Sequence, residues 1–336
     1  MALTGVSQKT VDADETGMRL DRWFKLHFPG VGFGQLQKLL RSGQVRVDGG
    51  RVKTASRLEA GQVVRIPPLD ADSSQKPRHM TPNTIRDRHD GDVLRDMVLY
   101  EDKKVLVFNK PAGLAVQGGS GISRSVDSML ESLRDKSGQK PRLCHRLDRD
   151  TSGVLVVAKT RGAAAELTKS FRHRDTQKTY WALLAGVPRK REGRISTYLV
   201  KEAGPDGDRM RIARHGERGA DHAVSFYRVV DSNPRKVSWV EMSPHTGRTH
   251  QLRIHAQHLG HPIVGDPKYF DIENWETPGG VQKKLHLHAR RILIPHPDAH
   301  MPVLDVTAPL PPHMLQSWNL FGFDEADGLV EEDDLS

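Results

Sequence analysis

A short apolar run at residues 154–158 directly follows a segment of strongly polar side chains. Five apolar residues in succession indicate a buried strand. The polar segment, residues 145–153, holds two aspartates and two arginines and ends in Ser152-Gly153, a pair typical of turns. We therefore expect a charged turn whose side chains are held in a fixed direction by the rigid strand that follows it. An ion-pair network that only closes the turn fits the same residues.

The hydrophobic pattern also predicts the elements around this strand. Long runs of strands with few helices are typical of an α+β fold with a mainly antiparallel, mixed sheet. The expected strands cover residues 104–109, 179–184, 195–200, 223–230, 237–242, 285–294 and 303–306, and the expected helices cover residues 162–171 and 249–259.

The N-terminal part of the chain has a different pattern. Apolar residues recur at helical spacing over residues 18–28 and 36–40, and Gly43 suits a helix stop. Alternation over residues 45–47 and 61–66 indicates short strands. These elements predict a small α/β domain.

Positive charge is concentrated in this domain. The chain carries a net charge of +9 and has a pI near 9.6, and residues 18–57 contain nine Lys or Arg against two Asp. Such a density favours contact with a phosphate backbone. We expect Trp23 and Phe24, which recur at helical spacing, to be core side chains rather than base-stacking platforms. The candidate RNA-contacting residues of this domain are Arg19, Arg22, Lys38, Arg41 and Arg46.

Two further segments differ in composition. Residues 69–92 contain no aromatic side chain and are rich in Pro, Ser, Asp, Arg and His, which predicts a flexible linker. The last thirteen residues hold seven acids, and we expect an acidic disordered tail over residues 326–336. The expected domains are therefore residues 18–68 and 93–325.

Several function classes lack their sequence signals. No apolar stretch approaches the about 18 residues of a membrane helix, and the first ten residues show no charged-then-apolar export signal. The single Cys144 excludes internal disulfides and fits a reducing cytoplasm, and packing suits it better than catalysis. The glycines after Lys110-Pro111 form neither Gly-x-Gly-x-x-Gly nor a Walker motif, so no nucleotide cofactor is indicated.

The polar turn and five further motifs occur in a known order. They resemble the large-ribosomal-subunit pseudouridine synthases of the RluA/RluC/RluD group, and Arg149-Asp150 most resembles the RluC type. The order of the N-terminal elements, with Arg-Leu-Asp-Arg-Trp at residues 19–23, resembles the S4 RNA-binding domain. The motifs are residues 145–153, Phe108-Asn109-Lys110-Pro111, Lys178-Thr179-Tyr180-Trp181-Ala182, residues 246–255, Gly260-His261-Pro262-Ile263 and Leu287-His288-Ala289.

The resemblance implies a function and the residues that perform it. It implies isomerisation of uridines in 23S rRNA to pseudouridine without cofactor or metal, by a cytoplasmic monomer whose partner is rRNA rather than a membrane. Asp148 matches the nucleophile or electrostatic partner, and Arg253 matches the guanidinium that pairs with it. Tyr180 matches the residue expected to stack on the base and to assist removal of the C5 proton. Asp150 is expected to brace the turn.

The resemblance also implies supporting roles. Arg146 matches the arginine that enters the space left by a flipped base, and His145 is expected to assist it or to hold the loop. Arg248 is expected to meet a phosphate or to close its loop. Ile254 and Leu287 fit either the floor beneath the base or plain core.

Other interpretations remain open at the level of the residues. Residues 148–151 also look like the Asp-x-Asp-x-Thr loop of haloacid dehalogenase phosphatases. In those enzymes an apolar strand precedes the loop, whereas in this chain His145 and Arg146 interrupt the apolar residues before it. The seventeen histidines suggest a metal site, but His250 and His255 are five residues apart and face different sides of a helix. A tRNA substrate, or a ribosome assembly factor that binds RNA without catalysis, also fits.

Overall fold

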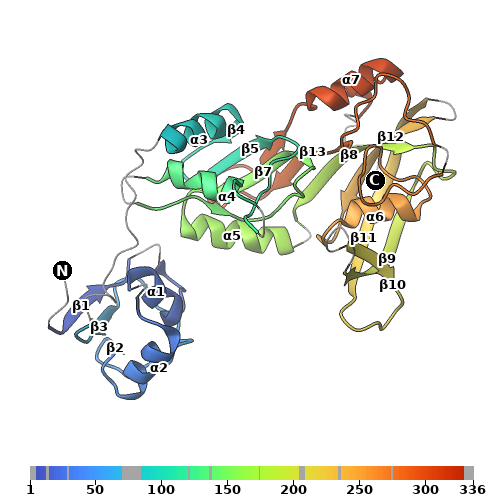
Figure 1. Cartoon of the computed structure of the whole chain (residues 1–336). Helices are drawn as coiled ribbons and strands as arrows, with labels where there is room; N and C mark the ends of the chain where they lie inside the picture. The colour runs from blue at the N-terminus through green and yellow to red at the C-terminus, as the bar shows by residue number, and fades with distance from the viewer. Residues whose placement is uncertain are drawn as a thin grey trace. The chain divides into compact units, whose positions relative to one another are not determined.

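The structure is a computed structural model of the chain (Figure 1). It describes residues 5–12, 15–28, 30–69, 85–119, 122–135, 138–173, 175–203, 209–233, 236–273 and 275–328. These residues divide into two compact units, the first formed mainly by the chain up to Ile85 and the second mainly by the chain from Arg86.

The first unit is a three-stranded antiparallel sheet with two helices. Helix α1 buries Trp23 and Phe24 completely, which confirms that they are core side chains. The helix before Gly43 ends as predicted, since that glycine has a φ of +69°. The elements are β1 (Ser7–Thr10), α1 (Leu20–His27), α2 (Phe33–Arg41), β2 (Arg46–Val47) and β3 (Val63–Ile66), in the sheet order β1-β3-β2.

The second unit is built on one large sheet. Its strands are β4 (Val98–Glu101), β5 (Val105–Lys110), β6 (Arg142–Leu143), β7 (Ser152–Ala158), β8 (Gln177–Ala185), β9 (Glu192–Glu202), β10 (Arg209–Ala213), β11 (Asp221–Asn233), β12 (Val237–Pro244), β13 (Leu287–Ile294) and β14 (Leu304–Thr307). The main order is β10-β9-β11-β12-β8-β13-β7-β5-β4, with β14 on β13 and β6 on β7. Among the strands described, only β7 and β13 pair in parallel, so the expected mainly antiparallel mixed sheet is confirmed.

Helices cover this sheet and connect its strands (Figure 1). They are α3 (Ile85–Asp96), α4 (Val126–Met129), α5 (Arg161–Arg172), α6 (Gln251–His258) and α7 (Pro312–Phe321), with 3₁₀-helices η2 (Leu130–Leu133) and η3 (Glu325–Gly328). In the described part of the chain, no helix combines the length and the apolar character needed to cross a bilayer.

Strand β7 is buried throughout, and it is apolar from Val154 to Ala158 because both of its faces are covered. Val154 and Val156 pack in one core cluster with Ala163 and Leu167 of α5, while Leu155 faces a second cluster with Phe108 and Met129. Each such side chain stabilises the fold by about 1.5 to 3 kcal/mol when fully buried. The predicted strand is thus confirmed, and it anchors the polar turn inside the sheet, between β13 and β5.

The domain boundaries differ from the expected ones at three points. Strand β1 pairs with β3, so the first unit begins before residue 18. Helix α3 begins at Ile85, inside the linker expected over residues 69–92; positions 70–84 lie outside the described residues. The disordered tail expected over residues 326–336 is wrong for residues 326–328, because they belong to η3, which places Gly328 against the indole rings of Trp181 and Trp239. Residues 329–336 also lie outside the described part.

We expect Gly153→Ala to destabilise the fold strongly. Gly153 has a φ of +107°, and a Cβ there would collide with the backbone of Ala289 on β13. Left-handed strain and overpacking together predict a loss of about 3 to 5 kcal/mol in urea unfolding. The control is Gly113→Ala, where φ is +88° but no atom lies within 4 Å of the added Cβ. Equal losses in the two variants would contradict this packing argument.

Candidate active site

Pairing within the sheet brings distant residues together. Ala289 of β13 pairs with Gly153 of β7 on one side and with Tyr180 of β8 on the other. Neighbouring strands lie about 4.8 Å apart. Tyr180 therefore lies within reach of the turn that precedes β7 and carries Asp148.

A buried lysine holds this turn from behind. Lys110 Nζ donates hydrogen bonds to the carbonyl oxygens of Pro111 and Leu114, both at 2.9 Å, and of Arg149 at 3.0 Å. Burial lowers the pKa of Lys110 to about 7, and the charges of Asp150 and Asp148 oppose that change. Three carbonyl acceptors match the three donors of an ammonium group, which supports its charged form.

Two histidines fix the strand that follows the turn. His145 Nε2 accepts a hydrogen bond from the amide of Val156 at 2.8 Å, and its ring stacks on Phe171. His288 donates from Nε2 to the carbonyl of Ala308, so its Nδ1 accepts the Ser152 hydroxyl proton at 2.9 Å. Of the two roles expected for His145, these contacts favour holding the loop.

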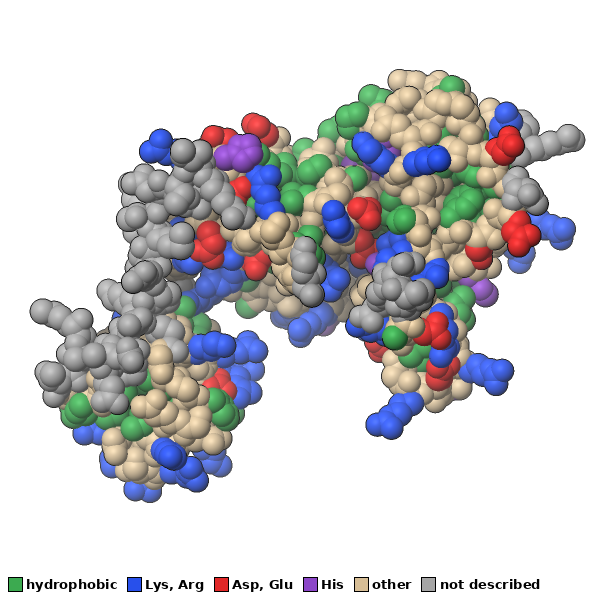
Figure 2. All heavy atoms as spheres, viewed as in Figure 1, with side chains coloured by type: hydrophobic (Ala, Val, Ile, Leu, Met, Phe, Trp, Pro, Cys, Tyr) green, Lys and Arg blue, Asp and Glu red, His purple; other side chains and the backbone are tan. Residues whose placement is uncertain are grey.

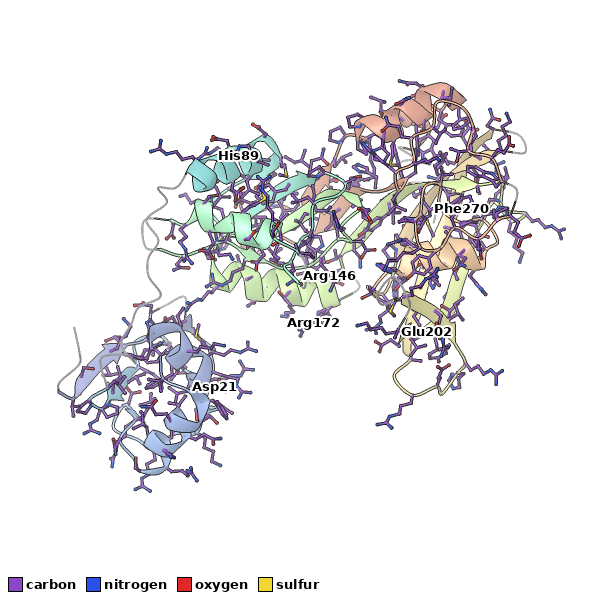
Figure 3. The ribbon with its side chains drawn as sticks, in the orientation of Figure 1. Asp21, His89, Arg146, Arg172, Glu202 and Phe270 are labelled. Atoms are coloured by element: carbon purple, nitrogen blue, oxygen red, sulfur yellow. The ribbon has the colours of Figure 1, made fainter. Side chains whose placement is uncertain are left out.

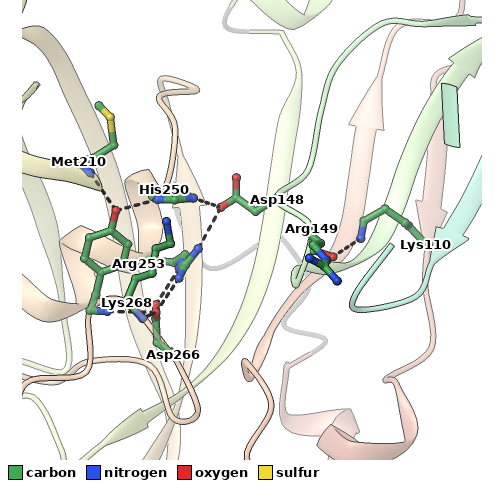
Figure 4. Close-up of polar contacts among 9 residues, drawn as sticks. Lys110, Asp148, Arg149, Met210, His250, Arg253, Asp266 and Lys268 are labelled. Atoms are coloured by element: carbon green, nitrogen blue, oxygen red, sulfur yellow. Dashed lines mark hydrogen bonds and ion pairs between the residues drawn. The ribbon is translucent and has the colours of Figure 1, made fainter. Parts of the chain in front are cut away.

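Asp148 presents its carboxylate to two donors. Its Oδ2 atom lies 3.9 Å from Nη1 of Arg253 and 3.9 Å from Nε2 of His250 (Figure 4). The side chain of Asp148 is 19% exposed, whereas that of Arg253 is 4% exposed. The carboxylate is therefore reachable from outside while its counter-charge is buried.

Arg253 is held by a second carboxylate. Its Nε and Nη2 atoms donate to the two oxygens of Asp266 at 2.7 and 2.6 Å. Asp266 also accepts the backbone amides of Lys268 and Tyr269. Burial opposes the charge on Arg253, but the hydrogen bonds and charge of Asp266, together with Asp148, raise the pKa of Arg253. The guanidinium is thus fixed, with Nη1 facing Asp148.

Gln251 sets the position of helix α6, which carries Arg253. Its Nε2 atom donates to the carbonyl of Val224 and to the hydroxyl of Ser225, and its Oε1 atom accepts the Thr246 hydroxyl. Gln251 also accepts the backbone amide of Arg248. The start of α6 is therefore tied to β11 at the point where Arg253 has to be placed.

Tyr180 is partly buried between two core clusters. Burial, followed by the nearby charge of Asp148, raises the pKa of Tyr180 well above its usual value. Its side chain is therefore a protonated phenol at neutral pH. Trp181 packs in another cluster, as the alternation of a strand requires.

The remaining residues expected at the site lie in different surroundings. Arg146 is exposed and has no hydrogen-bond or ion-pair partner within the part of the chain that the structure describes (Figure 3). Arg248 donates from Nε to the carbonyl of His222 and pairs with Asp221, so it closes its loop. Leu287 shares a core cluster with Tyr180, whereas Ile254 packs in another, with Leu199, Ala223 and Tyr269.

The basic residues of the first unit lie mostly at its surface. Figure 2 shows many Lys and Arg side chains on the visible face of this unit. Arg46 is half-buried, and it donates to the carbonyls of Gly43 and Gly49. Arg19 pairs with Asp21. Four of the five candidate RNA contacts are exposed, namely Arg19, Arg22, Lys38 and Arg41.

The residues considered for other chemistry have ordinary structural partners. Burial raises the pKa of Cys144 to about 11, so its thiol stays protonated and suits packing. His255 bonds to Thr197 and Ser225, and His286 bonds to Ser317. Over the described ranges, no group of three or more His, Cys, Asp or Glu side chains is arranged to hold a metal ion.

Three residues important to this geometry were not predicted. Lys110 lay inside a quoted motif, and Asp266 and His250 lay beside or within others, so proximity to motifs was the available signal. Their roles depend on partners far along the chain, which no local pattern shows.

Burial of neutral histidines predicts a pH dependence of stability. Burial lowers the pKa of His288 to about 3 and that of His286 to about 4. An unfolded histidine takes up its proton near pH ~6.5. The unfolded state therefore binds more protons as the pH falls from about 6.5 towards 4, and each such histidine lowers the unfolding free energy by up to about 1.4 kcal/mol per pH unit.

The variant His288→Asn tests this dependence. We expect it to be less stable than the wild type at pH 7.5 but to lose less stability between pH 7 and 5, because one titrating group is gone. Urea unfolding at several pH values measures how steeply the free energy of unfolding changes with pH in the wild type and in the variant. An unchanged slope would show that His288 does not titrate with unfolding.

The chain is similar in sequence to proteins of one known family. Residues 104–258 match a family described as RNA pseudouridylate synthase. The chain is 38% identical over 304 residues to ribosomal large subunit pseudouridine synthase C of Escherichia coli strain K12, covering 89% of this chain and 92% of that protein. It is 37% identical over 312 residues to the protein of the same name from Pasteurella multocida strain Pm70, covering 92% of each.

A solved structure is also similar. Human RNA Pseudouridylate Synthase Domain Containing 4 aligns with a TM-score of 0.58 and 30% identity, covering 70% of this chain and 97% of that chain. The similarity thus extends from the sequence to the arrangement of the strands.

Proposed function

Because the chain belongs to the RNA pseudouridylate synthase family, we propose that it isomerises uridines of large-subunit 23S rRNA to pseudouridine. The names of its bacterial relatives support the choice of RNA. The observation that carries the proposal is the partly exposed Asp148 carboxylate, which faces Arg253 at 3.9 Å and acts electrostatically on Tyr180.

The reaction needs few groups. The N1–C1′ bond of uridine breaks, the base turns, and a C5–C1′ bond forms while C5 loses a proton and N1 gains one. Atoms and electrons balance within the nucleotide, so the proposed reaction consumes no cofactor. Asp148 serves as nucleophile or electrostatic partner at the sugar-base junction, where an ionised carboxylate stabilises positive charge or forms a bond.

Tyr180 contributes mainly through its ring. As a protonated phenol it stacks on the uracil and donates a hydrogen bond without prior ionisation. A part in removing the C5 proton requires that its own proton first pass to another group. Leu287 belongs to the core cluster against which Tyr180 packs.

The target base has to leave its helix before it reaches Asp148. Flipping a base out of folded RNA costs about a few kcal/mol. Arg146 follows His145, whose ring is locked by Val156 and Phe171. The exposed guanidinium thus projects from a rigid base, which suits insertion into the space that the nucleotide leaves.

The first unit serves as an S4-like RNA-binding module in this proposal. Its exposed Arg19, Arg22, Lys38 and Arg41 supply phosphate contacts. A second RNA-binding unit on the same chain raises the effective concentration of the catalytic unit near its target. We propose that the enzyme acts as a monomer in the cytoplasm, on rRNA.

Deleting the gene and restoring it as wild type or as Asp148→Asn tests the function. We expect pseudouridine to disappear from a few large-subunit rRNA sites in the deletion strain and to return only with the wild type, because the amide cannot replace the carboxylate. Purified Asp148→Asn should bind rRNA as tightly as the wild type. The measurement is pseudouridine mapping of rRNA and tRNA.

Each other outcome points elsewhere. Loss of pseudouridine only in tRNA would show that the substrate is tRNA rather than rRNA. Full restoration of pseudouridine by Asp148→Asn would show that the Asp148 carboxylate takes no part in the reaction. Unchanged RNA modification together with defective ribosomes would favour an assembly factor.

Arg146→Ala tests base flipping. If Arg146 fills the vacated space, its loss should slow modification of folded rRNA by about 10- to 100-fold, as expected when about 1.4 to 2.8 kcal/mol of flipping cost is no longer offset. An unstructured oligonucleotide with the same sequence should be affected much less. Comparison of single-turnover rates on the two substrates gives the answer. The comparison variant is Arg149→Ala, which removes the other exposed guanidinium of the turn, one that donates to the carbonyl of Gly113. Equal losses on folded and unstructured RNA in Arg146→Ala would rule out the flipping role for Arg146.

A further inference from the structure

His250 occupies an unusual position beside the catalytic carboxylate. Its ring lies between two groups, with Nε2 3.9 Å from Asp148 Oδ2 and Nδ1 2.7 Å from the Tyr269 hydroxyl (Figure 4). Neither the proposed chemistry nor the sequence motifs assign this histidine a task. Asp266, which holds Arg253, also fixes the segment of Tyr269 by accepting its amide.

The hydrogen bonds at Tyr269 favour one tautomer of His250, the one with its proton on Nε2. The amide of Met210 donates to the phenol oxygen at 3.0 Å, so that oxygen is already an acceptor. The phenol's one proton is then available for Nδ1 of His250, and the imidazole proton is left on Nε2. Burial lowers the pKa of His250 and raises that of Tyr269, which keeps the imidazole neutral and the phenol protonated. In this tautomer the Nε2–H bond of His250 faces Asp148.

The backbone at this position is strained. His250 has a φ of +53° and precedes α6 as its N-cap. Among the described residues other than glycine, only Asp48, in the hairpin turn of the first unit, shares a positive φ. Such a conformation costs about 1 to 2 kcal/mol for a residue with a Cβ. The ring at this strained position contacts both Tyr269 and Asp148. Retained strain of this kind is typical of functional sites.

Both donors approach the same oxygen of Asp148. Arg253 Nη1 and His250 Nε2 each lie 3.9 Å from Oδ2. This separation exceeds a hydrogen bond, but catalytic hydrogen bonds in free enzymes are often long and shorten when substrate binds. If both contacts close on Oδ2, the other oxygen, Oδ1, is left for the nucleotide.

We propose that His250 is a positioning residue that donates a hydrogen bond from Nε2–H to Oδ2 of Asp148, so that Arg253 and His250 together aim Oδ1 at the reacting sugar-base junction. Tyr269 sets the tautomer that makes His250 a donor. This inference rests on the proposed function. It adds a second donor to the catalytic carboxylate and names the oxygen that reacts.

The two amide variants of His250 separate this role from a structural one. In His250→Gln the side-chain NH₂ reaches about as far as Nε2, whereas in His250→Asn it reaches only as far as Nδ1. Asn tolerates a positive φ better than Gln does. A role confined to the backbone therefore predicts that Asn is the better replacement, and a role as a donor to Asp148 predicts that Gln is.

The experiment measures kcat and KM on unmodified 23S rRNA transcribed in vitro. We expect His250→Asn to lower kcat by about 10- to 100-fold, as for loss of a hydrogen bond to a charged group, with KM nearly unchanged. His250→Gln should recover most of this loss. Any result in which Gln is no better than Asn overturns the proposal.

The tautomer is tested without activity. Nitrogen-15 spectra of the protein labelled in histidine, with the His250 signals assigned by their absence in His250→Asn, should show a proton on Nε2 at neutral pH. In Tyr269→Phe the Nδ1 form should become populated. A proton on Nδ1 in the wild type would overturn the proposal, even if the enzyme is active. A wild type that makes no pseudouridine in the kinetic assay would instead overturn the proposed function.

Discussion

One guanidinium shared by two carboxylates determines the geometry of the active site. A buried ion pair is tolerated only when its hydrogen-bonding groups are satisfied, because removing two charges from water is costly. Asp266 meets this condition, since it accepts two bonds from Arg253 and two backbone amides. With Nε and Nη2 engaged in this way, Nη1 faces Asp148. Asp148 thus gains a fixed counter-charge while its carboxylate stays partly exposed.

The sheet supplies the rigidity that this arrangement needs. The turn with Asp148 and the strand with Tyr180 both adjoin Ala289. Arg253 comes from a helix that Gln251 ties to β11. Three separate chain segments therefore meet through backbone pairing and buried hydrogen bonds, and the segment between α6 and β13 adds Asp266, which holds Arg253.

The sequence predicted those features that local pattern encodes. The apolar run of β7, the stop at Gly43 and the burial of Trp23 follow from spacing alone, whereas the pairing of Asp148 with Arg253 came from the family resemblance. Helix α3 was missed because it has a weak apolar stripe. It turns a polar residue, Asp90, inwards to pair with Arg124.

The partners of the catalytic groups could not be predicted for a related reason. Lys110, Asp266 and Tyr269 are polar residues whose burial is acceptable only because distant groups satisfy them. A sequence shows the cost of burying such a residue but not the partner that offsets it. Local propensity therefore identified the strands, whereas the second carboxylate that pairs with Arg253, that of Asp266, is evident only in the folded structure.

The charge balance of the site matters because the substrate is itself a polyanion. Asp148, Arg253 and Asp266 together have a formal charge of −1, which repels phosphate at short range. Lys110 stands behind the turn, and Arg146 and Arg149 are exposed on it, so positive groups surround the carboxylate. Acids cluster instead in residues 324–336, away from this turn in sequence. An excess of Lys and Arg on the body of the protein can thus draw RNA in while a single carboxylate remains charged at the point of reaction.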